Sequence, residues 1–136
     1  LKLSQNRHIS HYQLAIDMFD NNKLFGVGFK NFRHESFHRQ VNLGENIAVT
    51  THPHQIHFEF LSELGILGYI LIIGYFVFIL SISIKKYILS KNINILVYSL
   101  FIIVTLIPIL PSGSFFTTYG ATMFWVNCSF LFYNLL

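Results

Sequence analysis

Histidines gather just ahead of the most apolar part of the chain. The stretch TTHPHQIHFEF, residues 50–60, holds His52, His54 and His57, which are three imidazoles within six positions. Imidazole is the side chain that changes charge near neutral pH, and it is also a common metal ligand. Three interpretations follow: a metal site, acid–base chemistry on a substrate held at a membrane, or a chance enrichment of histidine in a loop.

The spacing of these histidines is poor for zinc. If a helix begins at Thr51 or His52, with Pro53 in its first turn, then His52, His54 and His57 point in different directions. A helical zinc pair takes ligands four residues apart, as in H-E-x-x-H, and this stretch has none. A pair made by His54 and His57 would need a third ligand from the other histidines, which are His8, His11, His34 and His38. We therefore predict no metal site.

Acid–base chemistry suits His54 better. The start of a helix disfavours a charged imidazole, so His54 would tend to stay neutral, as a general base must. The same helix start would suit an anion such as phosphate if Arg7, Arg33 or Arg39 lay nearby. A base beside arginines at a membrane surface indicates chemistry on a phosphate-linked lipid.

The composition is that of a membrane protein. Of the 136 residues, 53% are hydrophobic and only 11% are charged, against about 25% charged residues in a typical soluble domain. Every acidic residue and every histidine lies at or before Glu63, and the only charges after it are three lysines. We therefore expect an all-α polytopic membrane protein with an extracytoplasmic region, residues 1–64, and a transmembrane region, residues 65–136.

Three transmembrane helices are predicted, at about 65–84, 93–110 and 121–136. The first contains twenty consecutive uncharged residues, and about 20 apolar residues cross a bilayer. We expect it to continue an outer helix as one rod from about Pro53 to Ile84. Short lysine-rich loops stay in the cytoplasm, so the three lysines of residues 85–92 place residues 1–64 outside. The net charge of +3 comes from this loop, and nothing indicates nucleic-acid binding.

The outer region contains one clear amphipathic pattern. Apolar residues recur at helical spacing over Arg7–Asn22, which predicts a helix. Gly26 and Gly28 follow, and they permit positive φ or a close backbone approach. Residues 30–50 show no clear period and are expected to form a loop. The chain has no leader sequence at its start and ends within an apolar stretch, so we expect a piece of a longer protein.

Two stretches resemble a known family. HPHQIHFEFLSELGILGYI, residues 52–70, resembles the H-x-H-N…E-x-G-φ-φ-G signature of the O-antigen ligase and O-antigen polymerase superfamily. NRHISHYQLAIDMFDNNKLFGVGFKNF, residues 6–32, resembles the pattern that precedes it in the family: an arginine, a helix and a "plfGvG" turn. The two motifs cover most of residues 5–75, and the predicted topology matches that of the family.

This resemblance implies a glycosyltransferase of the inner (cytoplasmic) membrane that needs no metal or other cofactor. Its donor would be an undecaprenyl-diphosphate-linked glycan, and its acceptor a glycan, lipid A–core or a protein hydroxyl. The resemblance implies that Arg7 holds the diphosphate, that His54 activates the acceptor, and that Glu63 is the carboxylate of the motif. The residues predicted to bind substrate are His52, Gln55, Arg33 and Arg39. Gln55 stands where the family usually has asparagine, so the amide is kept on a longer arm.

The alternative is a non-enzymatic membrane protein, either a transporter or a metal-binding protein whose outer histidines bind cargo. A transporter should place ionisable residues near the middle of the membrane, and the three predicted spans contain none. This favours chemistry at the outer surface. The sequence leaves open whether the protein is a ligase, a polymerase or a protein transferase.

Overall fold

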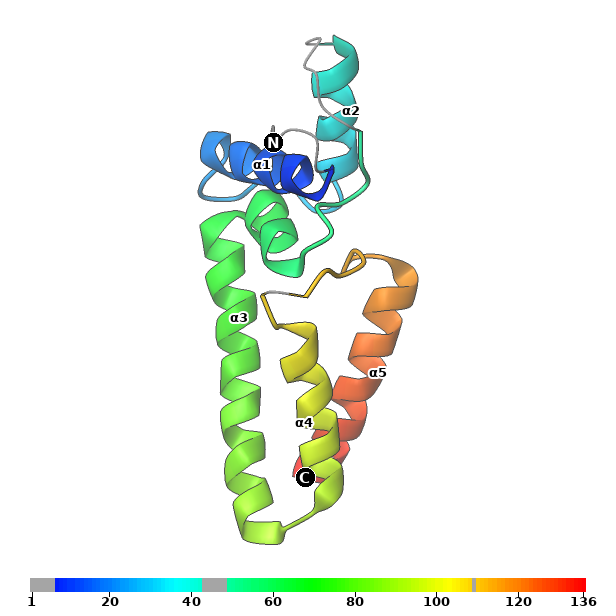
Figure 1. Cartoon of the computed structure of the whole chain (residues 1–136). Coiled ribbons are helices and arrows are strands. Elements are labelled where there is room, and N and C mark those ends of the chain that lie inside the picture. The colour runs from blue at the N-terminus through cyan, green and yellow to red at the C-terminus, as the bar shows by residue number, and fades with distance from the viewer. Residues whose placement is uncertain (1–6, 43–48, 109) are drawn as a thin grey trace. The chain divides into compact units, whose positions relative to one another are not determined.

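The structure is a computed structural model that describes residues 7–42, 49–108 and 110–136, with all of their side chains except those of Arg7, His8 and Asn42. Within these residues it contains five α-helices and no strand (Figure 1). The helices are α1 (Arg7–Asn21), α2 (Phe32–Asn42), α3 (Ile56–Ser90), α4 (Ile93–Thr105) and α5 (Thr118–Leu135). The all-α prediction is confirmed for this part of the chain.

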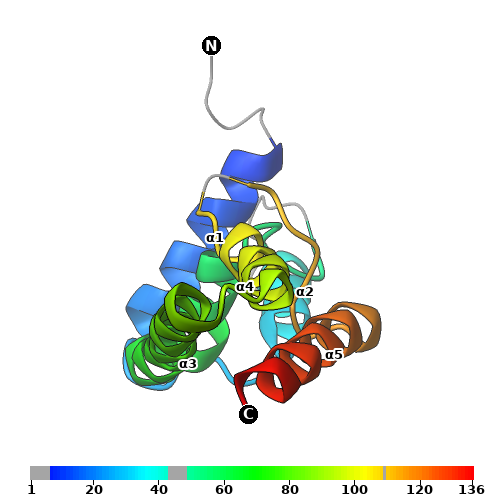
Figure 2. The same cartoon turned by 90° about the horizontal axis from the view of Figure 1, so that it is seen from below.

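The chain divides into two compact units. The first runs from the N-terminus to Ile70 and includes Pro108–Phe115, while the second consists of Leu71–Ile107 and Phe116–Leu136. In the second unit α5 packs along α4, as Figures 1 and 2 both show. A half-buried amide joins these two helices, since Asn127 Nδ2 donates to Tyr98 O at 3.1 Å. All the residues predicted from the sequence to form a site belong to the first unit.

Helix α1 confirms the predicted amphipathic helix almost to its ends. Its inward face carries Leu14, Ala15 and Met18, which form a hydrophobic core with Phe32 from the start of α2. The helix stops where asparagine side chains satisfy its last carbonyls, as when Asn22 Nδ2 donates to Met18 O at 3.2 Å. Unsatisfied carbonyls at a helix end need partners of this kind.

Helix α2 corrects the expectation that residues 30–50 form a loop. Its buried positions are Phe32, Ser36 and Arg39, which recur at helical spacing. Two of the three are polar, so the face has no apolar period to read from the sequence. Ser36 is satisfied in the interior because its Oγ accepts from Thr50 N at 3.0 Å. The helix is therefore held by buried polar contacts as well as by Phe32.

Helix α3 corrects the expected single rod over residues 53–84. The helix begins at Ile56, after the first two histidines of the motif, and its backbone breaks at Gly65, with φ 67° and ψ −173°. Essentially only glycine adopts this conformation. His57 Nδ1 lies 3.0 Å from Tyr69 Oη, although residues twelve apart in a straight helix are about 18 Å apart along its axis. Helix α3 is therefore two helical pieces with a sharp bend between them (Figure 1).

Among the described residues, α3 is the helix that is long and apolar enough to cross a membrane. Its most apolar window has a mean hydropathy of 2.4, and its long uncharged run begins directly after Glu63. Helix α4 is also apolar but has 13 residues. It ends at Thr105, earlier than the 93–110 range predicted for it, and Pro108 follows. Helix α5 begins at Thr118, slightly before its predicted start.

Candidate functional site

His54 lies between α2 and α3, two residues ahead of Ile56. Its backbone has φ 59°, a left-handed conformation that is uncommon for any residue with a side chain. Its carbonyl oxygen accepts a hydrogen bond from Ser112 N at 3.0 Å. Such conformations persist only where the surroundings impose them, and they are found disproportionately at functional sites. The residue that the sequence singled out is thus held in an unusual backbone state.

Three imidazoles meet at this point, and we call His11, His52 and His54 the imidazole cluster. The ring centroids of His52 and His54 are 4.1 Å apart, and His11 of α1 stacks on His54 at 5.3 Å. The expectation that the histidines diverge is wrong for His52 and His54, because neither lies on the helix that was assumed. His57 does lie on α3, and its ring is bonded to Tyr69.

The surroundings of His52 favour its neutral form. Burial lowers the pKa of His52, and the nearby imidazoles of His54 and His11 lower it further, because a second positive charge would be repelled. His52 Nδ1 lies 2.9 Å from Thr51 Oγ1. Its Nε2 is buried and has no hydrogen-bond partner among the described residues. A neutral imidazole with a free nitrogen can accept a proton or a hydrogen bond from a substrate.

The cluster does not have the form of a metal site. In the part of the chain that the structure describes, no group of three or more His, Cys, Asp or Glu side chains is arranged to hold a metal ion. The rings of His11 and His54 are stacked with an interplanar angle of 28°. Stacked rings present their faces to each other, whereas metal ligands must direct their nitrogens at one point.

Gln55, predicted to bind substrate, is buried and has both ends of its side chain engaged. Its Oε1 accepts from Phe58 N at 2.9 Å, which caps the first turn of α3 in the manner of an N-cap residue. Its Nε2 donates to Pro108 O, also at 2.9 Å. The longer arm, compared with the asparagine usual at this position, spans these two partners.

Glu63 accepts two backbone hydrogen bonds at the start of α2, from Lys30 N at 2.7 Å and from Phe32 N at 3.2 Å. A carboxylate is favoured there by the unpaired N–H groups of a helix N-terminus. Burial raises the pKa of Glu63, while these two hydrogen bonds oppose the rise. Glu63 therefore ties α3 to α2, and its oxygens are directed at backbone rather than at the imidazole cluster.

Glu59 is a second buried carboxylate, one turn earlier, that the sequence did not single out. It accepts from Ser114 Oγ and from Phe115 N, the latter at 2.8 Å. Burial raises its pKa to about 7, against the lowering effect of these two hydrogen bonds and with a further rise from Glu63. The only signal in the sequence was a carboxylate within the apolar run that leads into the membrane helix.

The three arginines predicted to hold phosphate are placed differently. Arg39 is buried and pairs with Asp17 of α1 and with Glu35, whose Oε1 lies 2.9 Å from Arg39 Nε. These pairs join α1 to α2. Arg33 is exposed on α2, and its charge lowers the pKa of Glu63. Arg7 is the first residue of α1, and its side chain lies outside the described part of the structure.

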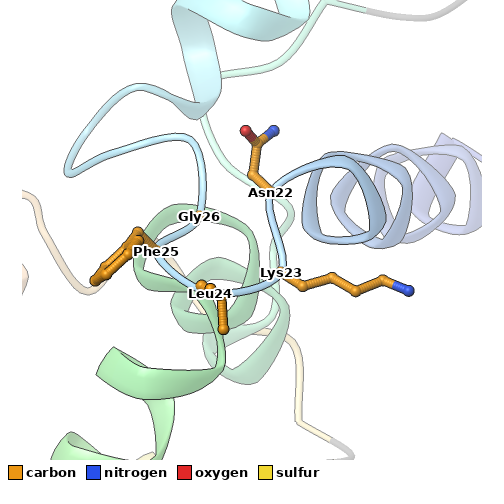
Figure 3. A pocket seen from close by; sticks show the side chains of 5 residues that line it. All are labelled: Asn22, Lys23, Leu24, Phe25 and Gly26. Carbon is orange, nitrogen blue, oxygen red and sulfur yellow. The ribbon is translucent and has the colours of Figure 1, made fainter.

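A separate open pocket of about 260 Å³ lies at the turn after α1 (Figure 3). It is lined by residues 22–26, and the side chains of Lys23 and Phe25 point away from each other. The turn is bonded to α3 just beyond its bend, since Ile66 N donates to Lys23 O at 2.8 Å. The pocket contains no imidazole and none of the predicted site residues.

These features define a helical protein with one helix long and apolar enough to cross a membrane, among the described residues, and with histidines at one end of that helix. Residues 2–73, more than half of the chain, match the family model of the O-antigen ligases. The chain therefore belongs to the O-antigen ligase family, as its two motifs indicated. No curated protein and no solved structure matches the chain. Together with α3, membership of this family of enzymes indicates a membrane protein that handles lipid-linked glycans.

Proposed function

We propose that this chain is part of a membrane glycosyltransferase of the O-antigen ligase or polymerase type. It would transfer a glycan from an undecaprenyl-diphosphate-linked donor to a hydroxyl of an acceptor, either a glycan or lipid A–core. The observation that carries the proposal is the imidazole cluster next to the N-terminal end of α3, with His54 at positive φ between His11 and His52. Family membership supports the class of substrate.

In the proposed reaction, His54 removes the proton from the acceptor hydroxyl. The acceptor oxygen attacks the anomeric carbon of the donor, and the bond from that carbon to the diphosphate oxygen breaks. General-base catalysis of this kind contributes about 10²–10⁴-fold to the rate. Arg7 stabilises the negative charge on the departing diphosphate, and Arg33 is an exposed cation of the same unit. No step requires a metal ion or another cofactor.

Glu63 and Arg39 take part through the fold rather than through the substrate. Glu63 fixes the start of α2, and Arg39 fixes α2 against α1, which carries Arg7 and His11. His52 presents its buried Nε2 beside His54, where a sugar hydroxyl could bind. Neutral imidazoles in this cluster would be ready to accept a proton without first losing one.

The reaction belongs at the outer face of the cytoplasmic membrane, since the donor lipid is presented there and residues 1–64 carry the cluster. We propose that the part of α3 that follows its bend at Gly65 lies in the membrane together with α4 and α5. Lys85 and Lys86 lie near the C-terminal end of α3, within the stretch expected to be a loop, and Lys91 follows the helix. These three lysines would then be cytoplasmic, and the opposite end of α3, with the histidines, would lie outside.

The proposal is tested by His54→Ala with His57→Ala as its matched control. Loss of the base should lower the transfer rate by about 10²-fold or more while donor binding changes little, because the proton moves only in the transition state. His57 lies outside the cluster and is bonded to Tyr69, so its loss should be much milder. Transfer is measured from the lipid-linked donor at equal membrane levels. Near-normal transfer by His54→Ala would remove its assignment and make His52 the next candidate.

A further inference from the structure

The segment Pro108–Phe115, which is described except for residue 109, lies between α4 and α5 and is hydrogen-bonded to His54 and to the neighbouring Gln55. Gln55 Nε2 donates to Pro108 O at 2.9 Å. Ser112 N donates to the carbonyl oxygen of His54 at 3.0 Å. Both partners are about fifty residues earlier in the sequence, and the segment belongs to the same compact unit as they do. The segment therefore holds the backbone of His54 directly.

Glu59 supplies a further attachment of this segment. One of its carboxylate oxygens accepts from Ser114 Oγ and the other accepts from Phe115 N at 2.8 Å. The ring of Phe115 meets Phe60 edge-on, with centroids 5.1 Å apart. Glu59 is only 2% exposed, and among the described residues no cation pairs with it. Both carboxylate oxygens of Glu59 therefore accept hydrogen bonds from the same segment, at Ser114 and Phe115.

A buried carboxylate is costly unless its hydrogen bonds are made. Glu59 makes its bonds to the segment rather than to an imidazole, so its role is not to exchange a proton with His54. Removal of its side chain would leave the Phe115 N–H and the Ser114 hydroxyl without this partner. The contacts of the segment with Gln55, with the His54 carbonyl and between the rings of Phe115 and Phe60 do not involve Glu59 and would remain.

We propose that Glu59 is a positioning residue for the transfer reaction, which holds the segment Pro108–Phe115 against His54 and so keeps His54 in its left-handed conformation. The inference rests on the proposed function, because it assumes that His54 is the base. It adds to that function a second part of the chain, from beyond the family match at residues 2–73. In this proposal the segment lies against the catalytic His54, and Glu59 holds the segment in place.

The attachment can be measured without any assay of activity. In the full chain with Cys128→Ser, single cysteines are introduced as Ser112→Cys and Gly113→Cys. Ser112 Oγ is buried, whereas a side chain at Gly113 would meet nothing within 4 Å. A thiol reagent should therefore modify position 112 more slowly than position 113. Adding Glu59→Ala should raise the rate at position 112 towards that at 113 and leave 113 unchanged.

Ser114→Ala removes the other side of the same hydrogen bond and should loosen position 112 in the same direction. This second variant keeps the test decisive if Glu59→Ala does not accumulate in the membrane. An unchanged rate at position 112 in either variant that accumulates normally would overturn the proposal, since the segment would then be held without Glu59.

The effect on catalysis separates positioning from folding. Glu59→Ala should lower kcat by about 10- to 100-fold, the size of effect that a small misplacement of a reacting group produces, with the KM for the donor unchanged. Glu59→Gln keeps an acceptor for Phe115 N and a polar partner for Ser114, so it should rescue most of the activity. Asp20→Asn, which alters an exposed carboxylate, is the control. A purely structural role would lower the amount of protein and leave kcat unchanged.

The outcomes distinguish this inference from the function on which it rests. If His54→Ala is inactive while Glu59→Ala loosens the segment and transfers normally, the positioning role is wrong and the proposed function stands. If Glu59→Gln lost as much transfer activity as Glu59→Ala, the positioning role would also be overturned. Transfer would then require the negative charge of Glu59 rather than its attachment to the segment. If His54→Ala transfers normally, the assignment of His54 as the base is wrong and His52 becomes the next candidate, and the positioning role of Glu59 towards His54 falls with that assignment. Cysteine modification then still reports whether Glu59 holds the segment.

Discussion

The backbones of Gly26 and Gly65 pass so close together that neither residue has room for a β-carbon. A β-carbon on Gly65 would lie 2.5 Å from Gly26 N, and one on Gly26 would lie 2.6 Å from Gly65 N. Both residues have positive φ, 68° and 67° respectively. The contact joins the turn after α1 to the bend in α3. It is reinforced alongside, where Gly28 N donates to Glu63 O at 3.0 Å.

Gly65→Ala should therefore destabilise the first unit strongly. The backbone conformation alone costs about 1–3 kcal/mol in a residue with a side chain, and the clash with backbone atoms adds to this. Gly74→Ala is the matched control, because a β-carbon at Gly74 would meet nothing within 4 Å. The fraction of solubilised protein that stays folded on heating should fall for Gly65→Ala and stay near the wild-type value for Gly74→Ala. Equal heat resistance would show that the close approach does not matter.

Arg7→Lys should fail in transfer although it keeps the positive charge. Lysine loses the planar fork of donors with which arginine binds two phosphate oxygens at once. Arg39→Lys is the informative comparison, because Arg39 is committed to Asp17 and Glu35. It should lower stability, with turnover per folded molecule largely kept. Steady-state transfer and the amount of folded protein are measured for both variants. Normal transfer by Arg7→Lys would reduce Arg7 to a generic positive charge or an interfacial anchor.

The pKa of Glu59 predicts that stability falls as the pH rises through neutrality. The folded protein holds a proton on Glu59 up to a pKa of about 7, whereas its ordinary value is 4.5. Its contribution is therefore fully present below pH 4.5 and is lost as the pH rises through 7. The raised pKa of Glu63 acts in the same direction, and the lowered pKa of His52 acts oppositely, below pH 6.5.

Glu59→Gln should flatten this dependence, because the amide does not titrate. Heat denaturation of the solubilised protein is followed from pH 4.5 to 8 for the wild type and the variant. The difference between the two curves should grow in favour of the variant as the pH rises. Parallel curves would show that Glu59 does not carry the shifted titration.

The proposed topology predicts which cysteines an impermeant thiol reagent reaches in intact cells. With Cys128→Ser as background, Ser90→Cys at the C-terminal end of α3, next to Lys91, should be protected from the reagent. Gln40→Cys on α2 should be labelled. Both positions are exposed on the protein, so any difference reflects the side of the membrane. The reverse pattern would place the imidazole cluster in the cytoplasm and contradict the proposed reaction.

Hydrophobic periodicity was enough to predict α1, and a continuous apolar run was enough to predict the part of α3 that follows Gly65. It failed for α2, where Ser36 and Arg39 occupy positions that face the interior. It also failed at Gly65, because a glycine within an apolar helix is ordinary. The reason for the break lies in the backbone of Gly26, about forty residues away, which no local pattern reveals. Turns and buried polar contacts between distant segments therefore could not be predicted from the hydrophobic pattern.

The site shows the same division. The resemblance to the family led to His54, and the structure adds His11 and Glu59, whose partners lie on other elements. The divergence expected of His52 and His54 was wrong because Pro53 was taken as the first turn of a helix. The helix instead begins after Gln55, whose side chain caps it. Because the start of the helix was predicted a few residues too early, the rings of His52 and His54 were expected to point apart, whereas their centroids are 4.1 Å apart.

The left-handed backbone of His54 has a consequence for how this position evolves. Selection for stability alone would favour glycine or asparagine there, since a left-handed conformation costs other residues about 1–2 kcal/mol. If His54 is the base, activity and stability place opposite demands on this position. In a lineage that had lost glycan transfer but kept the fold, residue 54 should be among the first of the motif to drift, while Gly26 and Gly65 persist.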